Sequence, residues 1–368
     1  MNKNLIVSLL SDQVVQNVMF IKQMKNEHSE FLFVSTDKME KKNINDGKSI
    51  KDRIKEVCKI NNGQFVIVKE DSIKNIKEEL SKIDFSIYEK ILVNITGGTK
   101  IMCIAVKEFF NDNHKAEIYY IPIGTNKIVN LQNEGSISIN CKITLLDYLK
   151  SYGIEIAKES KPIRSEEYTN KFHEEYYEYL KNILKELKKQ RELFRANKNK
   201  KNAPNKWHEL NDIKFKGYLE PLNKKEIDYL TGGWFEEFVY FKKKNEFCLE
   251  DDYIKTGVTI KTGVTEEGVP NEFDVMYVHN YKLCTIECKT SILKNESEKD
   301  NESEKDKKNK GTIMNDTIYK AKALLKGFGL TTEAWIYTLS SRQEIGDTGI
   351  KRAKIFDINV KSREDLDA

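Results

Sequence analysis

Residues 271–290 read NEFDVMYVHNYKLCTIECKT, and the fold of the C-terminal half of the chain depends on how this stretch is interpreted. Two runs of alternating apolar and polar residues flank a short turn at His279 and Asn280, which is the pattern of a β-hairpin. With a turn of two or four residues, Asp274 would lie opposite Thr285. One face of the hairpin would then carry only apolar or thiol side chains, those of Phe273, Val275, Tyr277, Cys284, Ile286 and Cys288. We expect this face to lie against the core.

The opposite face of the same hairpin carries Asp274, Glu287 and Lys289 close together. Two carboxylates and the carbonyl oxygen of Cys288 are a donor set that can hold a hard divalent cation. The Lys289 ammonium can then orient the attacking water or stabilise negative charge on a phosphate. Two alternatives stay open: Glu287 and Lys289 are ordinary solvated strand residues, or a three-residue turn sends these groups to opposite faces.

A helix is predicted ahead of the hairpin, over residues 232–243, GGWFEEFVYFKK. Its apolar residues recur at helical spacing, which predicts a buried side made of Trp234, Phe235, Phe238, Val239 and Phe241. Two adjacent acids, Glu236 and Glu237, are available to the site. We take Glu236 as the site residue and Glu237 as its alternative.

A helix with a glutamate, a strand ending at an aspartate and a strand with Glu-x-Lys resemble the core of the PD-(D/E)XK restriction-endonuclease-like nucleases. That resemblance implies a C-terminal α/β domain with a central hairpin. It also implies that Glu236, Asp274, Glu287 and Lys289 are catalytic and surround one or two Mg²⁺ or Mn²⁺ ions. The usual proline before the aspartate is replaced here by Phe273.

Strand-like and helix-like segments alternate through the N-terminal third of the chain. The expected strands are residues 5–10, 30–35, 65–68, 90–95 and 116–122. The expected helices are residues 14–24, 47–60, 72–83 and 101–111. Such alternation predicts a doubly wound, mostly parallel sheet, in which ligands bind beyond the carboxyl ends of the strands.

Two polar loops follow strands at that edge, Ser11-Asp12-Gln13 and Thr96-Gly97-Gly98-Thr99-Lys100. Glycines let backbone N–H groups approach an anion, a helix N-terminus adds its dipole, and Lys100 adds a full charge. The alternative is an ordinary strand-to-helix turn capped by Thr99. Neither the P-loop pattern nor the dinucleotide-binding pattern is present, so nucleotide hydrolysis and hydride transfer have little support.

The S-D-Q loop after a short first strand and the T-G-G-T-K-I-M helix start resemble the CARF domain, a Rossmann-like sensor of cyclic oligoadenylates in CRISPR systems. The resemblance covers about residues 1–145. It implies a homodimer in which the ring ligand lies across the two-fold axis. The implied cradle consists of Ser11, Asp12, Gln13, Gly97, Gly98, Thr99 and Lys100, with Thr36 as a weaker candidate.

The expected organisation is therefore a sensor domain at residues 1–145, a helical connector at 146–205 and a nuclease domain at 206–368. The connector changes from acidic to basic along its length. A solvated helix face is the default interpretation of such charge runs. The alternative is a basic wall that contacts nucleic acid.

Residues 294–310 contain the hexamer NESEKD twice and no apolar residue, which predicts a mobile loop. A helix is expected next at residues 315–328 and a core strand at residues 334–339. Within that helix, Tyr319 and Lys320 are candidate phosphate contacts.

The 368-residue chain is 33% charged with a net charge of +4, so it is not uniformly basic. No apolar run approaches the roughly 20 residues needed to span a membrane, and the apolar N-terminal stretch is too short for a signal peptide. The six cysteines form no C-x-x-C pair and the five histidines show no metal-ligand spacing. Reduced thiols, no zinc site and a cytoplasmic location are the expectation.

Together the two halves resemble the CRISPR ancillary nucleases, the CARF-plus-nuclease effectors of type III CRISPR defence. That resemblance implies activation by cyclic tetra-adenylate, use of Mn²⁺ or Mg²⁺, and cleavage of DNA and single-stranded RNA with little sequence preference. Two other functions stay open: a ligand-responsive DNA-binding regulator whose nuclease fold is inactive, and a ring nuclease that degrades the cyclic activator. No helix-turn-helix pattern supports the regulator.

Overall fold

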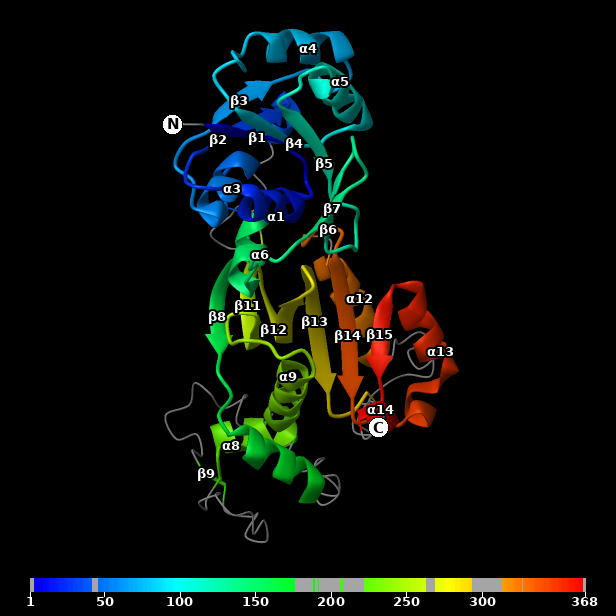
Figure 1. Cartoon of the computed structure of the whole chain (residues 1–368). Helices are drawn as coiled ribbons and strands as arrows, with labels where there is room; N and C mark the ends of the chain where they lie inside the picture. The colour runs from blue at the N-terminus through cyan, green and yellow to red at the C-terminus, as the bar shows by residue number, and fades with distance from the viewer. Residues whose placement is uncertain are drawn as a thin grey trace.

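The chain folds around two β-sheets that lie end to end (Figure 1). The computed structural model describes residues 3–41, 46–175, 188, 191, 206–207, 222–262, 269–292, 313–325 and 327–366. Among these residues, no helix is long and apolar enough to cross a membrane.

The N-terminal sheet has seven strands in the order β3-β2-β1-β4-β5-β6-β7. Its parallel part consists of β1 (Asn4–Leu9), β2 (Ser29–Ser35), β3 (Gln64–Ile67), β4 (Lys90–Asn94) and β5 (Ala116–Tyr120). Two short antiparallel strands, β6 (Lys127–Asn130) and β7 (Ser136–Ser138), extend it at one edge. The predicted parallel, Rossmann-like sheet is confirmed, although β6 and β7 were not expected.

Helices cover both faces of this sheet because its parallel strands are joined by crossovers. One face packs against α1 (Val14–Met24) and α3 (Ile50–Cys58), and the other against α4 (Ile73–Ser81) and α5 (Lys100–Asn111). A short helix, α2 (Asp37–Glu40), follows β2. Every crossover helix predicted from the sequence is present.

The C-terminal sheet has six strands in the order β15-β14-β13-β12-β11-β8. Neighbouring strands are antiparallel from β8 (Glu155–Ser160) through β11 (Ile254–Thr262) and β12 (Val269–His279) to β13 (Lys282–Lys289). They are parallel from β13 through β14 (Thr332–Thr338) to β15 (Ile358–Lys361). This sheet of mixed parallel and antiparallel strands contains the predicted central hairpin.

Helices sandwich the C-terminal sheet. One face packs against α9 (Trp234–Glu246), which follows α8 (Lys224–Asp228) and a π-helical turn, η1 (Tyr229–Gly233). The other face packs against α12 (Ile313–Leu325). The remaining elements are α13 (Arg342–Ile355), α14 (Arg363–Leu366) and a small two-stranded sheet, β9 (Lys206–Trp207) with β10 (Leu222–Asn223).

A single apolar cluster runs from the N-terminal domain into the C-terminal domain through α6 (Leu145–Ser151). The Thr144 side chain and Asp147 begin this helix with a capping box. The hydroxyl group of Tyr148 donates to the carbonyl oxygens of Phe328 at 3.0 Å and Thr331 at 3.1 Å. Because α6 belongs to the cores of both domains, their relative placement is held by buried side chains.

The range predicted as a helical connector, residues 146–205, contains β8, an edge strand of the C-terminal sheet. Its sequence, EIAKES, is largely exposed, so no apolar alternation marked it as a strand. Residues 166–175 are helical, as expected. Most of the remaining basic half of the connector and the 294–310 loop lie outside the described residues.

The hairpin has its predicted parity but a different register. Val275 pairs with Ile286 and His279 with Lys282, so Thr285 lies opposite Met276 rather than Asp274. The turn consists of Asn280 and Tyr281, both with positive φ (49° and 60°). A two-residue turn with two left-handed residues matches the twist of paired strands.

Five of the six residues predicted for the core face of the hairpin pack in the cluster that contains α9; these are Val275, Tyr277, Cys284, Ile286 and Cys288. Phe273 is the exception, because it packs in the other cluster, with its ring 5.9 Å from that of Phe328. The described pairing of β12 with β13 ends at Val275, so the alternation across the hairpin does not extend to Phe273.

Candidate active site and effector edge

Three polar side chains meet where the pairing of β12 with β13 ends. Asp274 Oδ2 accepts a hydrogen bond from the backbone N–H of Cys288 at 2.6 Å. Lys289 Nζ lies 2.9 Å from Glu287 Oε2 and 3.8 Å from Asp274 Oδ2. One ammonium group therefore contacts both carboxylates that the hairpin parity placed together.

A second lysine reaches the same cluster from α12. Lys320 Nζ lies 3.2 Å from Glu287 Oε1, so each carboxylate oxygen of Glu287 has its own ammonium partner. The Glu287 side chain is only 7% exposed, whereas that of Lys320 is 48% exposed. The site thus combines a buried carboxylate with a cation at its solvent side.

The two candidate glutamates in the first turn of α9 have different interaction partners. Glu237 is buried, and its carboxylate accepts hydrogen bonds from the backbone N–H groups of Ile163 and Arg164, at 2.5 Å and 3.3 Å. Glu237 therefore ties α9 to the segment that follows β8. Glu236 lies within electrostatic reach of Asp274, so it is the glutamate on this helix available to the cluster.

Burial, together with the crowding of carboxylates, raises the pKa values of two carboxyl groups in the cluster. The pKa of Glu236 is raised to about 8, mainly by burial and then by the charges of Asp274 and Glu272. The pKa of Asp274 is raised to about 6 by burial and by the charge of Glu287, against the opposing charge of Lys289. Burial lowers the pKa of Lys289, but Asp274 and Glu287 reverse this and raise it overall.

Side chains supply only some of the ligands that a divalent cation would need at this site. In the part of the chain that the structure describes, no group of three or more His, Cys, Asp or Glu side chains is arranged to hold a metal ion. Asp274 and Glu287 offer two hard oxygen ligands, and their mutual repulsion favours a cation between them. The other ligands would be the Cys288 carbonyl oxygen and water, because the Cys288 thiol packs in the apolar core.

The second candidate site lies at the carboxyl edge of the N-terminal sheet. Since β2, β1 and β4 are adjacent and parallel, the loops that follow them lie side by side. Gly97 comes so close to the first loop that a Cβ there would lie 2.2 Å from the carbonyl oxygen of Leu9. Gly98 has a φ of +78°, which favours glycine. The two glycines are therefore required by the close packing of these loops.

Side chains at this edge fall into two groups. Thr99 and Thr36 are helix caps: each accepts a hydrogen bond from a backbone N–H, that of Met102 at 3.2 Å and that of Met39 at 3.3 Å. Thr36 is buried, which limits its contact with a ligand. Ser11, Asp12 and Lys100 are at least partly exposed at the edge.

Gln13 connects this edge to the C-terminal domain. Its side-chain oxygen accepts a hydrogen bond from the backbone N–H of Leu330 at 3.0 Å. Leu330 lies in the short loop between α12 and β14. The first predicted ligand loop is therefore in direct contact with the domain that carries the acidic cluster.

The turn of the hairpin makes a second contact between the domains. The hydroxyl group of Tyr281 donates to the carbonyl oxygens of Ile139 at 2.9 Å and Cys141 at 3.1 Å. The Asn126 side chain donates to that of Asn280 at 3.2 Å. No sequence pattern pointed to Tyr281, because its role depends on a segment more than a hundred positions away.

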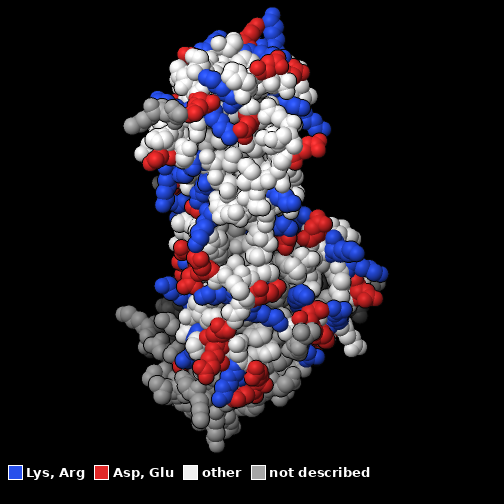
Figure 2. All heavy atoms as spheres, viewed as in Figure 1, with Lys and Arg blue, Asp and Glu red and all other residues white. Residues whose placement is uncertain are grey.

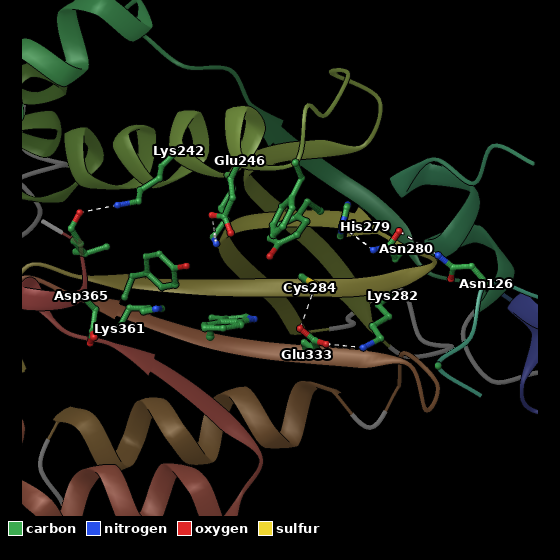
Figure 3. A pocket seen from close by; sticks show the side chains of 17 residues that line it. Asn126, Lys242, Glu246, His279, Asn280, Lys282, Cys284, Glu333, Lys361 and Asp365 are labelled. Carbon is green, nitrogen blue, oxygen red and sulfur yellow. Dashed lines mark hydrogen bonds and ion pairs between the residues drawn. The ribbon is translucent and has the colours of Figure 1, made fainter. Parts of the chain in front are cut away.

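A cavity of about 550 Å³ opens beside this contact and is separate from the acidic cluster (Figure 3). Asn126 lines it from one domain, and Tyr277, Lys282 and Glu333 line it from the other. Its charged groups are largely paired with one another, for example Lys282 with Glu333 at 2.9 Å. None of the four predicted catalytic residues lines this cavity.

Figure 2 shows basic and acidic side chains interspersed over both domains on the face in view. No broad patch of one sign dominates the described atoms of that face. Attraction of a polyanion to this face would therefore depend on individual cations near a site rather than on the overall field.

Comparisons with known proteins agree with this two-part architecture. The family model described as Card1 CARF domain matches residues 5–148, and the model described as Card1-like, endonuclease domain matches residues 223–367. No curated protein matches the chain.

Three solved structures share the fold. Protein VC1899 from Vibrio cholerae has a TM-score of 0.74 at 18% identity, with 99% of this chain and 95% of that chain covered. Can2 from Sulfobacillus thermosulfidooxidans, in complex with cyclic tetra-adenylate, has a TM-score of 0.68 at 20% identity, with 97% and 95% covered. A type III CRISPR defence DNA nuclease activated by cyclic oligoadenylate has a TM-score of 0.55 at 14% identity, with 92% and 46% covered.

The raised carboxyl pKa values predict that the metal-free protein loses stability as the pH rises. The folded protein retains protons on Glu236 and Asp274 at pH values where the unfolded chain has lost them, so the contribution of these two groups to stability falls from about pH 4 to about pH 8. We expect Glu236→Gln to raise the melting temperature at pH 8 by a few degrees and to change it less at pH 5. Thermal denaturation in EDTA measures this.

The control for that measurement is Glu250→Gln, which alters a carboxylate whose side chain is 69% exposed. It should leave the pH dependence unchanged. Equal effects of the two variants, or a lower melting temperature of Glu236→Gln at pH 8, would show that Glu236 is not strained by neighbouring negative charge.

Proposed function

The chain joins a Card1 CARF domain to a Card1-like endonuclease domain, and from this premise we propose that it is a metal-dependent nuclease activated by a cyclic oligoadenylate in type III CRISPR defence. The observation that carries the proposal is the convergence of Asp274, Glu287 and Lys289 within the endonuclease domain. The substrates proposed are DNA, which it would nick or degrade, and single-stranded RNA, with little sequence preference.

Each residue of the cluster has a proposed role in phosphodiester hydrolysis. Asp274 and Glu287, with the Cys288 carbonyl oxygen, would hold Mn²⁺ or Mg²⁺, which when bound supplies an activated water and neutralises phosphate charge. Lys289 contacts both carboxylates, so it is positioned to orient the water or stabilise the transition state. Glu236 supports the site from α9, beside Asp274.

The proposed activator is cyclic tetra-adenylate, bound at the carboxyl edge of the N-terminal sheet in a homodimer. Ser11, Asp12, Gly97, Gly98, Thr99 and Lys100 would form each half of its cradle, with Gln13 and Thr36 at the margin. The support is the Card1 CARF match and the fold shared with Can2, whose structure contains cyclic tetra-adenylate. A lysine in the first turn of a helix, as Lys100 is in α5, suits a phosphate group.

We further propose that the signal reaches the nuclease through the two contacts between the domains. Gln13 contacts Leu330, in the loop that follows α12, and Tyr281 contacts the segment that follows β7. The hairpin whose turn contains Tyr281 carries Asp274 and Glu287 at the end away from the turn. A ligand can shift the equilibrium only by its differential affinity for two states, and these contacts are where the states would differ.

The first test is cleavage of plasmid and single-stranded substrates with Mn²⁺, with and without cyclic tetra-adenylate. We expect cleavage to depend on the ring, and we expect Glu287→Ala to lose cleavage by about two orders of magnitude or more because it removes a metal ligand. Ring binding by this variant should be unchanged. The matched control, Asp357→Ala, removes a carboxylate that is 87% exposed in the same domain.

Cleavage by Glu287→Ala at the wild-type rate would refute the site assignment. Ring-independent cleavage by the wild type would refute the activation. Tight ring binding with no cleavage would favour the DNA-binding regulator, and loss of intact ring in the Glu287→Ala variant would reveal a ring nuclease.

Lys100→Ala should weaken binding of cyclic tetra-adenylate about tenfold, because it removes one charged contact to phosphate. The metal site should be unaffected, so Mn²⁺-dependent cleavage should return at higher ring concentration. Isothermal titration calorimetry at two salt concentrations measures the loss. Lys107→Ala, an exposed lysine farther along α5, is the control; equal weakening by both variants would refute a specific contact.

Tyr281→Phe should separate ring binding from activation. The substitution removes the hydroxyl group that donates to Ile139 and Cys141, while the aromatic side chain and its packing stay in place. We expect ring affinity within about twofold of wild type and a several-fold lower activation of cleavage. Tyr253→Phe, at a partly exposed tyrosine of the same domain, is the control, and unchanged activation in Tyr281→Phe would show that the contact is only structural.

A further inference from the structure

The two lysines that neutralise Glu287 differ in how firmly they are held. Lys289 contacts two carboxylates from within β13, and its side chain is 29% exposed. Among the residues that the structure describes, Lys320 forms its ion pair with Glu287 alone, at 3.2 Å, and its side chain is 48% exposed. Lys320 is therefore the cation of the cluster that can leave its partner at the lower cost.

Lys320 projects from a rigid support. The buried side of α12 consists of Met314, Thr317, Ile318, Ala321 and Leu325, which fix the helix against the sheet. Lys320 lies on the solvent side of this helix, and its flexible stem reaches back to the acidic cluster. The position of its Cα is thus set by the core, while its ammonium group is free to change partners.

A polyanionic substrate would need such a cation in order to approach the carboxylates of the cluster. Asp274 and Glu287 place carboxylate charge at the point where the phosphodiester of the proposed substrate would arrive, which repels the strand. A divalent ion shared by Asp274 and Glu287 would in turn repel the ammonium groups that now contact Glu287. Lys320 is exposed and, within the described part of the chain, is paired with Glu287 alone, so its ammonium group would then turn toward the solvent side, from which a strand would approach.

We propose that Lys320 is a substrate-binding residue of this nuclease, which pairs with Glu287 in the free protein and contacts a phosphate of the bound strand next to the scissile bond. This inference rests on the proposed function. It assigns to Lys320 a role distinct from that of Lys289, because one lysine binds the strand and the other serves the reacting phosphate.

The experiment compares Lys320→Met with Lys322→Met in the full-length protein bound to cyclic tetra-adenylate. Lys322 lies on the same helix, is 39% exposed, and pairs at 3.5 Å with the exposed Asp357, so it matches Lys320 in exposure but not in position. Cleavage kinetics on a single-stranded DNA oligonucleotide give kcat and KM. Fluorescence anisotropy with the same oligonucleotide, in an Asp274→Asn background with Mg²⁺, gives Kd without cleavage.

Lys320→Met should raise KM and Kd about tenfold with kcat within about threefold of wild type, because it removes a binding contact. The slope of log K against log salt should fall by about 0.7, the value for one phosphate contact to a single strand. Lys320→Arg should restore binding, since it keeps the charge. Lys322→Met should leave Kd and the slope unchanged.

The proposal is overturned if Lys320→Met leaves Kd and the salt slope unchanged and alters only kcat or the melting temperature, because Lys320 would then be only the ion-pair partner of Glu287. Lys320→Gln provides a second neutral variant if Lys320→Met unfolds. Failure of the proposed function has a separate signature: the wild type, with ring and Mn²⁺, would not cut the oligonucleotide at all.

Discussion

The two-residue turn at Asn280 and Tyr281 is the constraint on which the C-terminal domain depends. Its two left-handed residues fix the register of β12 against β13. A shift of that register by one residue would move the side chains of one strand to the opposite face of the sheet. That register ends beside Asp274 and Glu287, which Lys289 joins by ion pairs. At the other end it presents Tyr281 to the N-terminal domain. One local backbone geometry therefore determines both the acidic cluster and a contact with the sensor.

The acidic cluster is held together against its own repulsion. Burial and neighbouring charge raise the pKa values of Glu236 and Asp274, which means that the fold stabilises their charged forms poorly. Lys289 and Lys320 offset part of this cost by ion pairing. If the site holds the proposed metal ion, the repulsion that lowers stability in the free protein would also favour binding of that cation.

The sequence predicted those features that depend on local periodicity. The parallel sheet and its crossover helices follow from the alternation of strand-like and helix-like segments. The grouping of Asp274 with Glu287 follows from the alternation of apolar and polar residues along the hairpin, which a two-residue error in register leaves intact. Features set by distant contacts were not predictable. The choice between Glu236 and Glu237 depends on backbone N–H groups after β8, and β8 itself has too few buried residues to be recognised as a strand.

The continuous core through α6 limits how a signal can pass between the domains. Since Tyr148 and its neighbours pack in both domains, a free hinge at this junction would cost buried contacts. Gly329 lies so close to Tyr152 that a Cβ there would be 2.1 Å from the tyrosine hydroxyl, so the loop after α12 has little room to move independently. In the proposed activation, a displacement of the loop that holds Gln13 would therefore be carried to Leu330 and α12 as a rigid shift, and α12 carries Lys320, which lies beside Glu287. The proposed activation therefore relies on a stiff junction, rather than a flexible one, to let a small change at the sheet edge alter the charge balance of the acidic cluster.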